Sequence, residues 1–196
     1  KNSSGTKTLF TGLLNCGGKM ELKETKIQSV SKFSGNIIDV YQDQVRLPNG
    51  KLASRDVVRH CQAVVVVPIL PNGDIVFVEQ YRYPLQEVLL ELPAGKLDAG
   101  EELLTCAERE LAEETGYRAE KMQYLGKIAT TPGFCDEIIH VFLAEKLIAG
   151  LACPDSDEFL QVKILTSAAV KSAIQTGSLY DSKSLAALYL QEISCK

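Results

Sequence analysis

The 196-residue chain has no excess of positive charge and no long hydrophobic run, and each absence excludes a class of function. Its 21 Lys and Arg residues are outnumbered by 25 Asp and Glu residues, for a formal net charge of −4. Binding of a nucleic-acid backbone usually needs a basic face, so this charge argues against it as the main activity. The longest apolar run, residues 63–70, suits a buried strand and is far shorter than the roughly 20 residues of a membrane-spanning helix.

The chain also lacks any Cys-x-x-Cys pair and any internal repeat. Its six cysteines are scattered, which indicates neither a zinc site nor a thioredoxin-like motif. Reduced thiols in a cytoplasmic protein are the simplest interpretation. A hydrophobic content of 45% with 23% charged residues is typical of a soluble globular protein.

The length predicts one ordinary domain with a small appendage. Residues 1–19 are polar at their start and are not expected to belong to the folded domain. We expect them to be a flexible tail, an upstream extension or a cloning remnant. Residues 20–60 form a strand-rich region too small to bury a core of its own. Such a region must pack on the main domain, residues 61–196, or on a partner subunit.

Alternating hydrophobic patterns and turn signals predict a mixed fold. Residues 63–70 and 74–80 flank Pro71-Asn72-Gly73 and are expected to pair as a hairpin. The other expected strands are residues 37–41, 45–47, 51–59, 88–92, 122–128, 138–144 and 159–165. Helices are expected over residues 101–115, 167–176 and 182–193, the last capped by Asp181 or Ser182. Strands with helices on two faces give an α/β fold, an α/β/α sandwich.

The helix predicted over residues 101–115 carries an unusual acidic stripe. At about 100° per residue, Glu110, Glu113 and Glu114 lie on one stripe, next to a packing stripe of Leu103, Leu104, Ala107 and Leu111. Like charges at this spacing cost roughly 0.2–0.5 kcal/mol per pair, and Arg109 offsets only part of that cost. The stripe is either a solvated acidic face or a site for a hard cation, Mg²⁺ or Mn²⁺.

The spacing around this helix resembles the Nudix box. Gly95 is followed after five residues by Glu101 and after seven more by Arg109-Glu110-Leu111-x-Glu113-Glu114-x-Gly116-Tyr117. Tyr117 stands where the family usually has an aliphatic residue.

Further segments resemble the ADP-ribose pyrophosphatase branch of that family. Pro132 follows Gly116 by 16 residues, as is typical of the branch. The similarity covers roughly residues 22–194, with a departure at Cys61-Gln62, where the branch more often has Pro-Gly. The matching segments are residues 54–60, 78–84, 91–95 and 131–137.

The resemblance implies a Nudix-type α/β/α sandwich and a Mg²⁺-dependent homodimer, joined through the N-terminal sheet. The implied reaction is hydrolysis of ADP-ribose to AMP and ribose 5-phosphate. One alternative is a Nudix hydrolase of another nucleoside diphosphate sugar or of a dinucleotide. Another is a non-catalytic regulator that binds ADP-ribose, against which the intact acidic stripe argues, as does the absence of a basic DNA-binding appendage.

The resemblance also implies roles for individual residues. Glu110, Glu113 and Glu114 are expected to bind the metal together with the main-chain carbonyl of Ala94. The general base is expected from a loop after the box, where Glu158 is the match and Glu113 is the alternative.

Substrate contacts are expected from Arg55 and Arg82, whose guanidinium groups suit a phosphate or an adenine ring. Gly133 and Glu137 belong to the Pro-Gly-Phe-x-x-Glu motif, and Glu137 is expected to accept hydrogen bonds from ribose hydroxyls. Glu101 is either a second metal contact or a structural partner of Arg109, and we favour the structural role. Neither histidine is needed for the reaction, and His140 is expected to be structural.

Overall fold

The computed structural model of the protein describes residues 21–153 and 159–194. The expectations for residues 1–19 and for Glu158 therefore lie outside the described residues. None of the helices within those ranges is long and apolar enough to span a membrane.

A three-stranded antiparallel sheet forms the N-terminal region, as the strand pattern predicted. It consists of β1 (Thr25–Ser34), β2 (Ile38–Arg46) and β3 (Leu52–His60) in the order β1-β2-β3. The two short strands expected at residues 37–47 are one continuous strand, β2. Gly50 closes the β2–β3 turn with a φ of 82°, a left-handed conformation that glycine adopts without steric cost.

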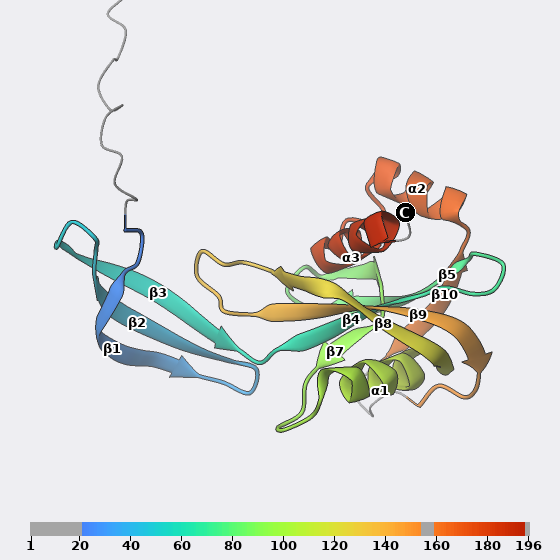
Figure 1. Cartoon of the computed structure of the whole chain (residues 1–196), viewed down its shortest axis with the longest axis horizontal. Coiled ribbons are helices and arrows are strands. Elements are labelled where there is room, and N and C mark those ends of the chain that lie inside the picture. Colours follow the sequence, from blue (N-terminus) through green and yellow to red (C-terminus); the bar gives the residue numbers. More distant parts are fainter. Residues whose placement is uncertain (1–20, 154–158, 195–196) are drawn as a thin grey trace, which may run out of the picture.

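The main domain has two further sheets and three helices (Figure 1). One sheet has the order β7-β4-β9-β8 and the other β10-β5-β6. The strands are β4 (Ala63–Pro68), β5 (Ile75–Arg82), β6 (Glu87–Glu91), β7 (Ala94–Lys96), β8 (Tyr117–Ala129), β9 (Ile138–Ala149) and β10 (Leu160–Leu165). The helices are α1 (Leu103–Thr115), α2 (Ser167–Thr176) and α3 (Ser182–Ser194). This confirms the mixed α/β class with its separate antiparallel N-terminal sheet.

The prediction that residues 63–70 and 74–80 pair as a hairpin is wrong, although the turn between them forms. Leu70 N–H donates to the Asp74 carbonyl at 2.9 Å, but β4 pairs with β7 and β9 while β5 pairs with β6 and β10. Only an isolated bridge joins Ile69 to Ile75. The physical reason for this different pairing is that β4 is a central, fully buried strand. Its four valines, Val64 to Val67, have no exposed surface, so both faces of β4 must be covered by other layers of the fold.

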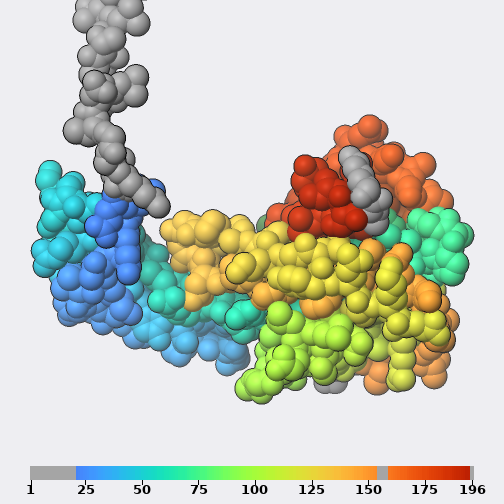
Figure 2. Space-filling model, viewed as in Figure 1, coloured from blue at the N-terminus to red at the C-terminus, as the bar shows by residue number. Residues whose placement is uncertain are grey.

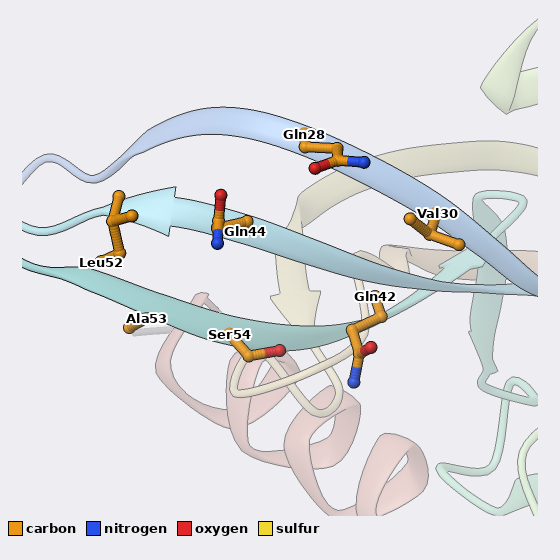
Figure 3. Close-up of a pocket in the computed structure, with 7 residues that line it drawn as sticks. All are labelled: Gln28, Val30, Gln42, Gln44, Leu52, Ala53 and Ser54. Carbon is orange, nitrogen blue, oxygen red and sulfur yellow. The ribbon is translucent and has the colours of Figure 1, made fainter.

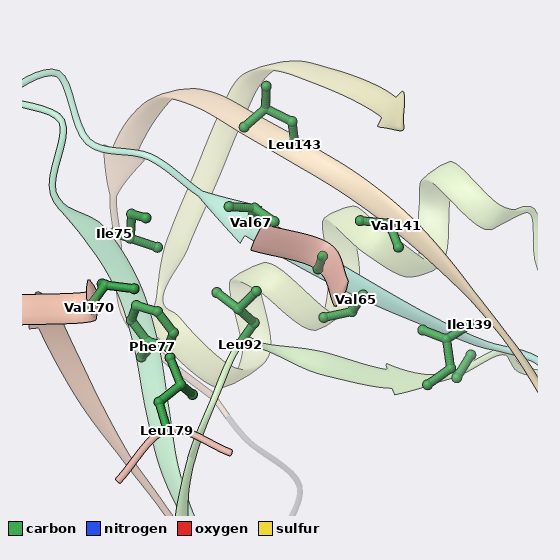
Figure 4. Packing of buried hydrophobic residues seen from close by; sticks show 12 residues of the cluster. Val65, Val67, Ile75, Phe77, Leu92, Ile139, Val141, Leu143, Val170 and Leu179 are labelled. Carbon is green, nitrogen blue, oxygen red and sulfur yellow. The ribbon is translucent and has the colours of Figure 1, made fainter. Parts of the chain in front are cut away.

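Those layers are two hydrophobic clusters separated by β4. Val65 and Val67 join one cluster with Phe77, Leu92 and Leu179, beneath α2 and α3 (Figure 4). Val64 and Val66 point to the opposite face, since side chains alternate along a strand, and pack against α1.

The packing face of α1 differs from the predicted leucine stripe. Leu104 is 47% exposed, whereas Cys106, Ala107 and Leu111 are buried together with Glu110 and Glu114. The buried face of α1 therefore includes part of the acidic stripe. Packing holds these carboxylates at the edge of the core instead of leaving them in solvent.

Candidate active site

A cavity of about 750 Å³ lies where α1, β7, the end of β5, the start of β9 and the start of α3 meet. Helix α1 contributes Arg109 and the three glutamates of the acidic stripe. His60, at the end of β3, also lines it. The cavity thus joins the main domain to the base of the N-terminal sheet.

Close packing between β7 and α1 positions two of the carboxylates. A Cβ atom on Gly95 would lie 1.9 Å from Cδ of Glu110, so only glycine leaves room for this carboxylate. The Ala94 N–H donates to Oε2 of Glu114 at 3.1 Å. Glu110 and Glu114 are only 7% and 4% exposed. The spacing from Gly95 to Glu114 therefore has a steric basis.

Arg109 joins the acidic side chains around it. Its Nε donates to Glu101 Oε1 at 2.9 Å, and its Nη1 donates to Glu110 Oε1 at 2.8 Å and to Glu113 Oε2 at 3.0 Å. The hydrogen bond from Arg109 lowers the pKa of Glu101 to about 2. The structural role expected for Glu101 agrees with this ion pair.

The donor set fits a hard divalent cation. Three carboxylates gather with one arginine between them, and every side chain of the acidic stripe offers oxygen, the ligand atom that Mg²⁺ prefers. In the described ranges, no three His, Cys, Asp or Glu side chains are placed so that they could hold a metal ion. Arg109 hydrogen-bonds to both Glu110 and Glu113 in this arrangement. The assignment of Glu110, Glu113, Glu114 and Ala94 as ligands stays a prediction.

The predicted substrate residues divide into two groups. Arg82 and Glu137 line the cavity, whereas Arg55 and Gly133 do not. Arg55 lies on β3 in an exposed ion pair with Glu24, at 2.6 Å. Glu137 accepts a hydrogen bond from Thr130 Oγ1 at 2.7 Å and lies 3.5 Å from Nδ1 of His60.

A charged cluster at the start of α3, which the sequence did not indicate, also reaches the cavity. Lys183 and Asp181 line the cavity, and Lys183 contacts the buried carboxylate of Glu91. The sequence indicated only that Asp181 or Ser182 caps the helix. Asp181 is that cap, because its Oδ2 accepts the Ser184 N–H at 3.0 Å.

His140 and Cys106, two further groups with catalytic chemistry, are held in structural roles. His140 is 8% exposed, bonded to Tyr124 Oη at 3.1 Å and to Gln62 Oε1 at 2.7 Å, and burial lowers its pKa. Burial raises the pKa of the Cys106 thiol to about 12, which keeps it protonated and unreactive. His140 is therefore structural, as expected.

Comparisons with known proteins agree with this geometry. The family model described as NUDIX domain matches residues 59–188. The chain is 43% identical to the ADP-ribose pyrophosphatase of Bacillus subtilis over 173 residues, which cover 87% of this chain and 94% of that protein. It is 44% identical to the methanol dehydrogenase activator of Bacillus methanolicus over 180 residues, 89% of this chain and 95% of that one.

A solved structure described as an ADP compounds hydrolase has the same fold. The two superpose with a TM-score of 0.81 over 89% of this chain and 95% of that one. Their sequences are 21% identical, so this likeness concerns the fold alone.

Proposed function

Because this chain belongs to the Nudix family of pyrophosphohydrolases, we propose that its substrate is ADP-ribose, which it cleaves to AMP and ribose 5-phosphate. The observation that carries this proposal is the acidic stripe of α1, of which Glu110 and Glu114 are buried, and which lines a cavity that also contains cationic side chains. The similarity to the Bacillus subtilis ADP-ribose pyrophosphatase over nearly that whole protein supports the choice of substrate.

We propose that Glu110, Glu113, Glu114 and the Ala94 carbonyl hold Mg²⁺. Bound there, the ion would neutralise phosphate charge and lower the pKa of a bound water molecule. Gly95 leaves room for the Glu110 carboxylate, and the Ala94 N–H orients that of Glu114. These fixed positions avoid the cost of reorganising the carboxylates during the reaction.

Proton removal from the attacking water needs a carboxylate within hydrogen-bond reach. We propose Glu158 as this base, with Glu113 as the alternative. Glu113 lines the cavity, and its side chain is 34% exposed. Glu158→Gln decides between the two, because loss of the base lowers kcat more than it changes KM. An unchanged kcat in this variant would favour Glu113, whose own replacement also removes a proposed metal ligand.

We propose that the N-terminal sheet joins two copies of the chain. β1 is exposed along its whole length, and neither core cluster among the described residues includes a residue of this sheet. Ile27, Val30, Phe33 and Leu52 are each more than 40% exposed. The N-terminal sheet lies beside the main domain (Figure 2). A hollow of about 390 Å³ on this sheet is lined by residues that include Val30 and Leu52 (Figure 3).

The relative named methanol dehydrogenase activator favours a second candidate function, which is activation of a dehydrogenase. Adding this chain to methanol dehydrogenase and measuring alcohol oxidation tests it directly. A rise in dehydrogenase rate that disappears with Glu114→Gln would show that activation depends on hydrolysis.

The substrate assignment is tested by turnover of ADP-ribose in excess Mg²⁺, in parallel with ADP-glucose, NADH and diadenosine polyphosphates, with products separated by chromatography. The proposal predicts that ADP-ribose is cleaved fastest, with release of AMP and ribose 5-phosphate. Faster cleavage of another compound would keep Nudix hydrolysis and discard the substrate. Binding of ADP-ribose without cleavage of any compound would favour a regulator.

A further inference from the structure

A two-residue linker joins the N-terminal sheet to the main domain at the edge of the cavity. β3 ends at His60 and β4 begins at Ala63, and both of these residues line the cavity. The linker therefore consists of Cys61 and Gln62. Its geometry sets where the end of β3 lies relative to the main domain.

The backbone of Gln62 holds the loop that follows β7. Its carbonyl accepts the Leu97 N–H at 3.0 Å, beside the ladder in which Ala63 of β4 pairs with Lys96 of β7. Lys96 and Asp98, the two neighbours of Leu97, both line the cavity. One residue thus joins the end of the N-terminal sheet to the loop that leads into α1.

The side chain of Gln62 is held by a buried histidine. Nε2 of His140 lies 2.7 Å from Oε1 of Gln62, and Nδ1 of His140 lies 3.1 Å from Oη of Tyr124. A carbonyl oxygen only accepts, so Nε2 donates to Gln62 and Nδ1 accepts from the tyrosine hydroxyl. His140 is 8% exposed, and its Nε2–H needs this acceptor because an unpaired buried donor is costly.

His140 is neutral in this arrangement. Burial lowers its pKa, and the charge of Lys127, which is paired with it on β8, lowers the pKa further. A neutral imidazole has one donor and one acceptor, which match Gln62 and Tyr124 one to one. The ring of Tyr124 packs edge-on against that of Phe142, with 5.4 Å between the ring centroids. The bonds that lead to Gln62 therefore start from a packed ring.

These bonds depend on a position at which the sequence departs from the branch it resembles. The branch more often has Pro-Gly at residues 61–62, and glycine has no side chain that could reach His140. Gln62 and His140 have no part in the proposed chemistry, and neither of them lines the cavity. Bonds that tie cavity-lining segments together from outside the cavity suit the positioning of those segments.

We propose that Gln62, held by His140 and Tyr124, is a positioning residue that fixes the spacing between the end of β3 and the β7–α1 loop for substrate binding. This inference rests on the proposed function in that ADP-ribose is the ligand whose binding reports the spacing. Without the bond to His140 the linker gains freedom, and His60 and Asp98 are placed less precisely around the substrate. Substrate binding then weakens more than the chemical step, because the acidic stripe itself is not displaced.

Steady-state kinetics with ADP-ribose test this role. Gln62→Leu removes the acceptor at similar side-chain size and is expected to raise KM about fivefold, the effect of losing one hydrogen bond, with a much smaller change in kcat. Gln62→Glu keeps an oxygen acceptor for Nε2 of His140 and should recover most of the loss. The matched control is Lys121→Met, which breaks an exposed ion pair with Glu145 on β8 and β9, outside the cavity.

A double-mutant cycle shows whether Gln62 and His140 act as a unit. His140→Leu should raise KM about as much as Gln62→Leu does. The variant with both changes should be no worse than either, because the second change has no bond left to remove. His140→Gln keeps an N–H donor and should lie near the wild type. Increases in KM that multiply in the double variant would overturn the proposal.

Amide hydrogen exchange without substrate separates this inference from the proposed function. The Leu97 N–H should exchange faster in Gln62→Leu than in the wild type or the control, since its acceptor belongs to the loosened linker. If the wild type hydrolyses ADP-ribose while Gln62→Leu matches it in KM and in Leu97 exchange, the positioning role is refuted and the function stands. If the wild type does not hydrolyse ADP-ribose, the proposed function fails. Faster exchange at Leu97 would then still support the positioning role, and unchanged exchange would refute it.

Circular dichroism identifies a variant that does not fold. Should Gln62→Leu be unfolded, Gln62→Ala removes the acceptor without adding a larger apolar group to this exposed position. A normal KM and normal exchange at Leu97 in that variant would overturn the positioning role.

Discussion

Arg109 forms ion pairs with three carboxylates at the active-site cavity. These carboxylates belong to Glu101, Glu110 and Glu113. The pKa of Arg109 is raised, and the hydrogen bond to Glu101 is the largest cause. Glu101 anchors one edge of the guanidinium, so that Nη1 is aimed at the two glutamates of α1. The order of the acidic stripe therefore depends on a carboxylate outside the helix.

This dependence predicts how stability changes with pH. The pKa of Glu101 is lowered from 4.5 to about 2, chiefly by Arg109, so its ion pair stabilises the fold fully above the unfolded value and loses that effect as pH falls toward 2. Glu101→Gln should reduce the free energy of unfolding at pH 7 by about 1–2 kcal/mol. The difference from the wild type should shrink below pH 4.5.

Urea denaturation at pH 7 and pH 3 measures this difference. Glu102→Gln is the matched control, because Glu102 is exposed and makes no side-chain capping bond. A difference between Glu101→Gln and wild type that is equal at both pH values would contradict the ionic origin of the effect.

At the scale of elements, the end of β3 is clamped to the loop between β8 and β9. Val58 N–H donates to the Phe134 carbonyl at 2.7 Å, and Asp136 accepts from Arg59 Nη1 at 2.7 Å and from the His60 N–H at 2.9 Å. Burial raises the pKa of Asp136, but these bonds lower it overall. The clamp places His60 and Glu137 together at the cavity.

Loosening the clamp should impair substrate binding. Asp136→Ala removes both bonds and is expected to raise KM for ADP-ribose about tenfold, because small displacements of positioning groups are costly. Asp136→Asn keeps an acceptor for the His60 N–H and should lose less. Steady-state kinetics decide this, with Glu145→Ala as control, since its exposed pair with Lys121 lies outside the cavity. Equal kinetics for Asp136→Ala and the control would rule the clamp out.

At the scale of the whole molecule, the exposed N-terminal sheet predicts a dimer. Light scattering should give twice the 21.4 kDa mass of the chain. Phe33→Asp places a charge on an aromatic position of this sheet that is 56% exposed and should yield monomers. Tyr189→Asp, on α3 and 64% exposed, should leave the dimer intact. A wild-type chain of monomeric mass at micromolar concentration would refute the interface.

Local patterns predicted most of the elements and part of the site. Helix α2 has the predicted bounds, and α1 begins two residues later than expected, since turn and capping residues act over short distances. The partners of β4 were not predictable from its neighbours, because burial on both faces selects them.

The residues of the cavity that could be predicted are those carried by a motif, namely the acidic stripe of the Nudix box and the single residues Arg82 and Glu137 in two other matching segments. The contact between Glu91 and Lys183 joins positions 92 residues apart, and only the folded chain brings them together. Arg55 matches the family motif, yet it lies toward the start of β3, and only the end of that strand, at His60, lines the cavity of its own chain. In the proposed dimer, the cavity of the partner subunit is the site where Arg55 would contact a substrate.

Metal-dependent hydrolysis at the acidic stripe is tested by the rate of ADP-ribose hydrolysis by Glu114→Gln in a Mg²⁺ titration, measured beside the wild type. The wild type should be activated to saturation by Mg²⁺. The variant should remain folded by circular dichroism and lose about a thousandfold or more in kcat, since a carboxylate ligand and its charge are both removed. Wild-type turnover by Glu114→Gln, or wild-type hydrolysis that does not respond to Mg²⁺ and its chelation, would contradict the role of the acidic stripe as the metal site.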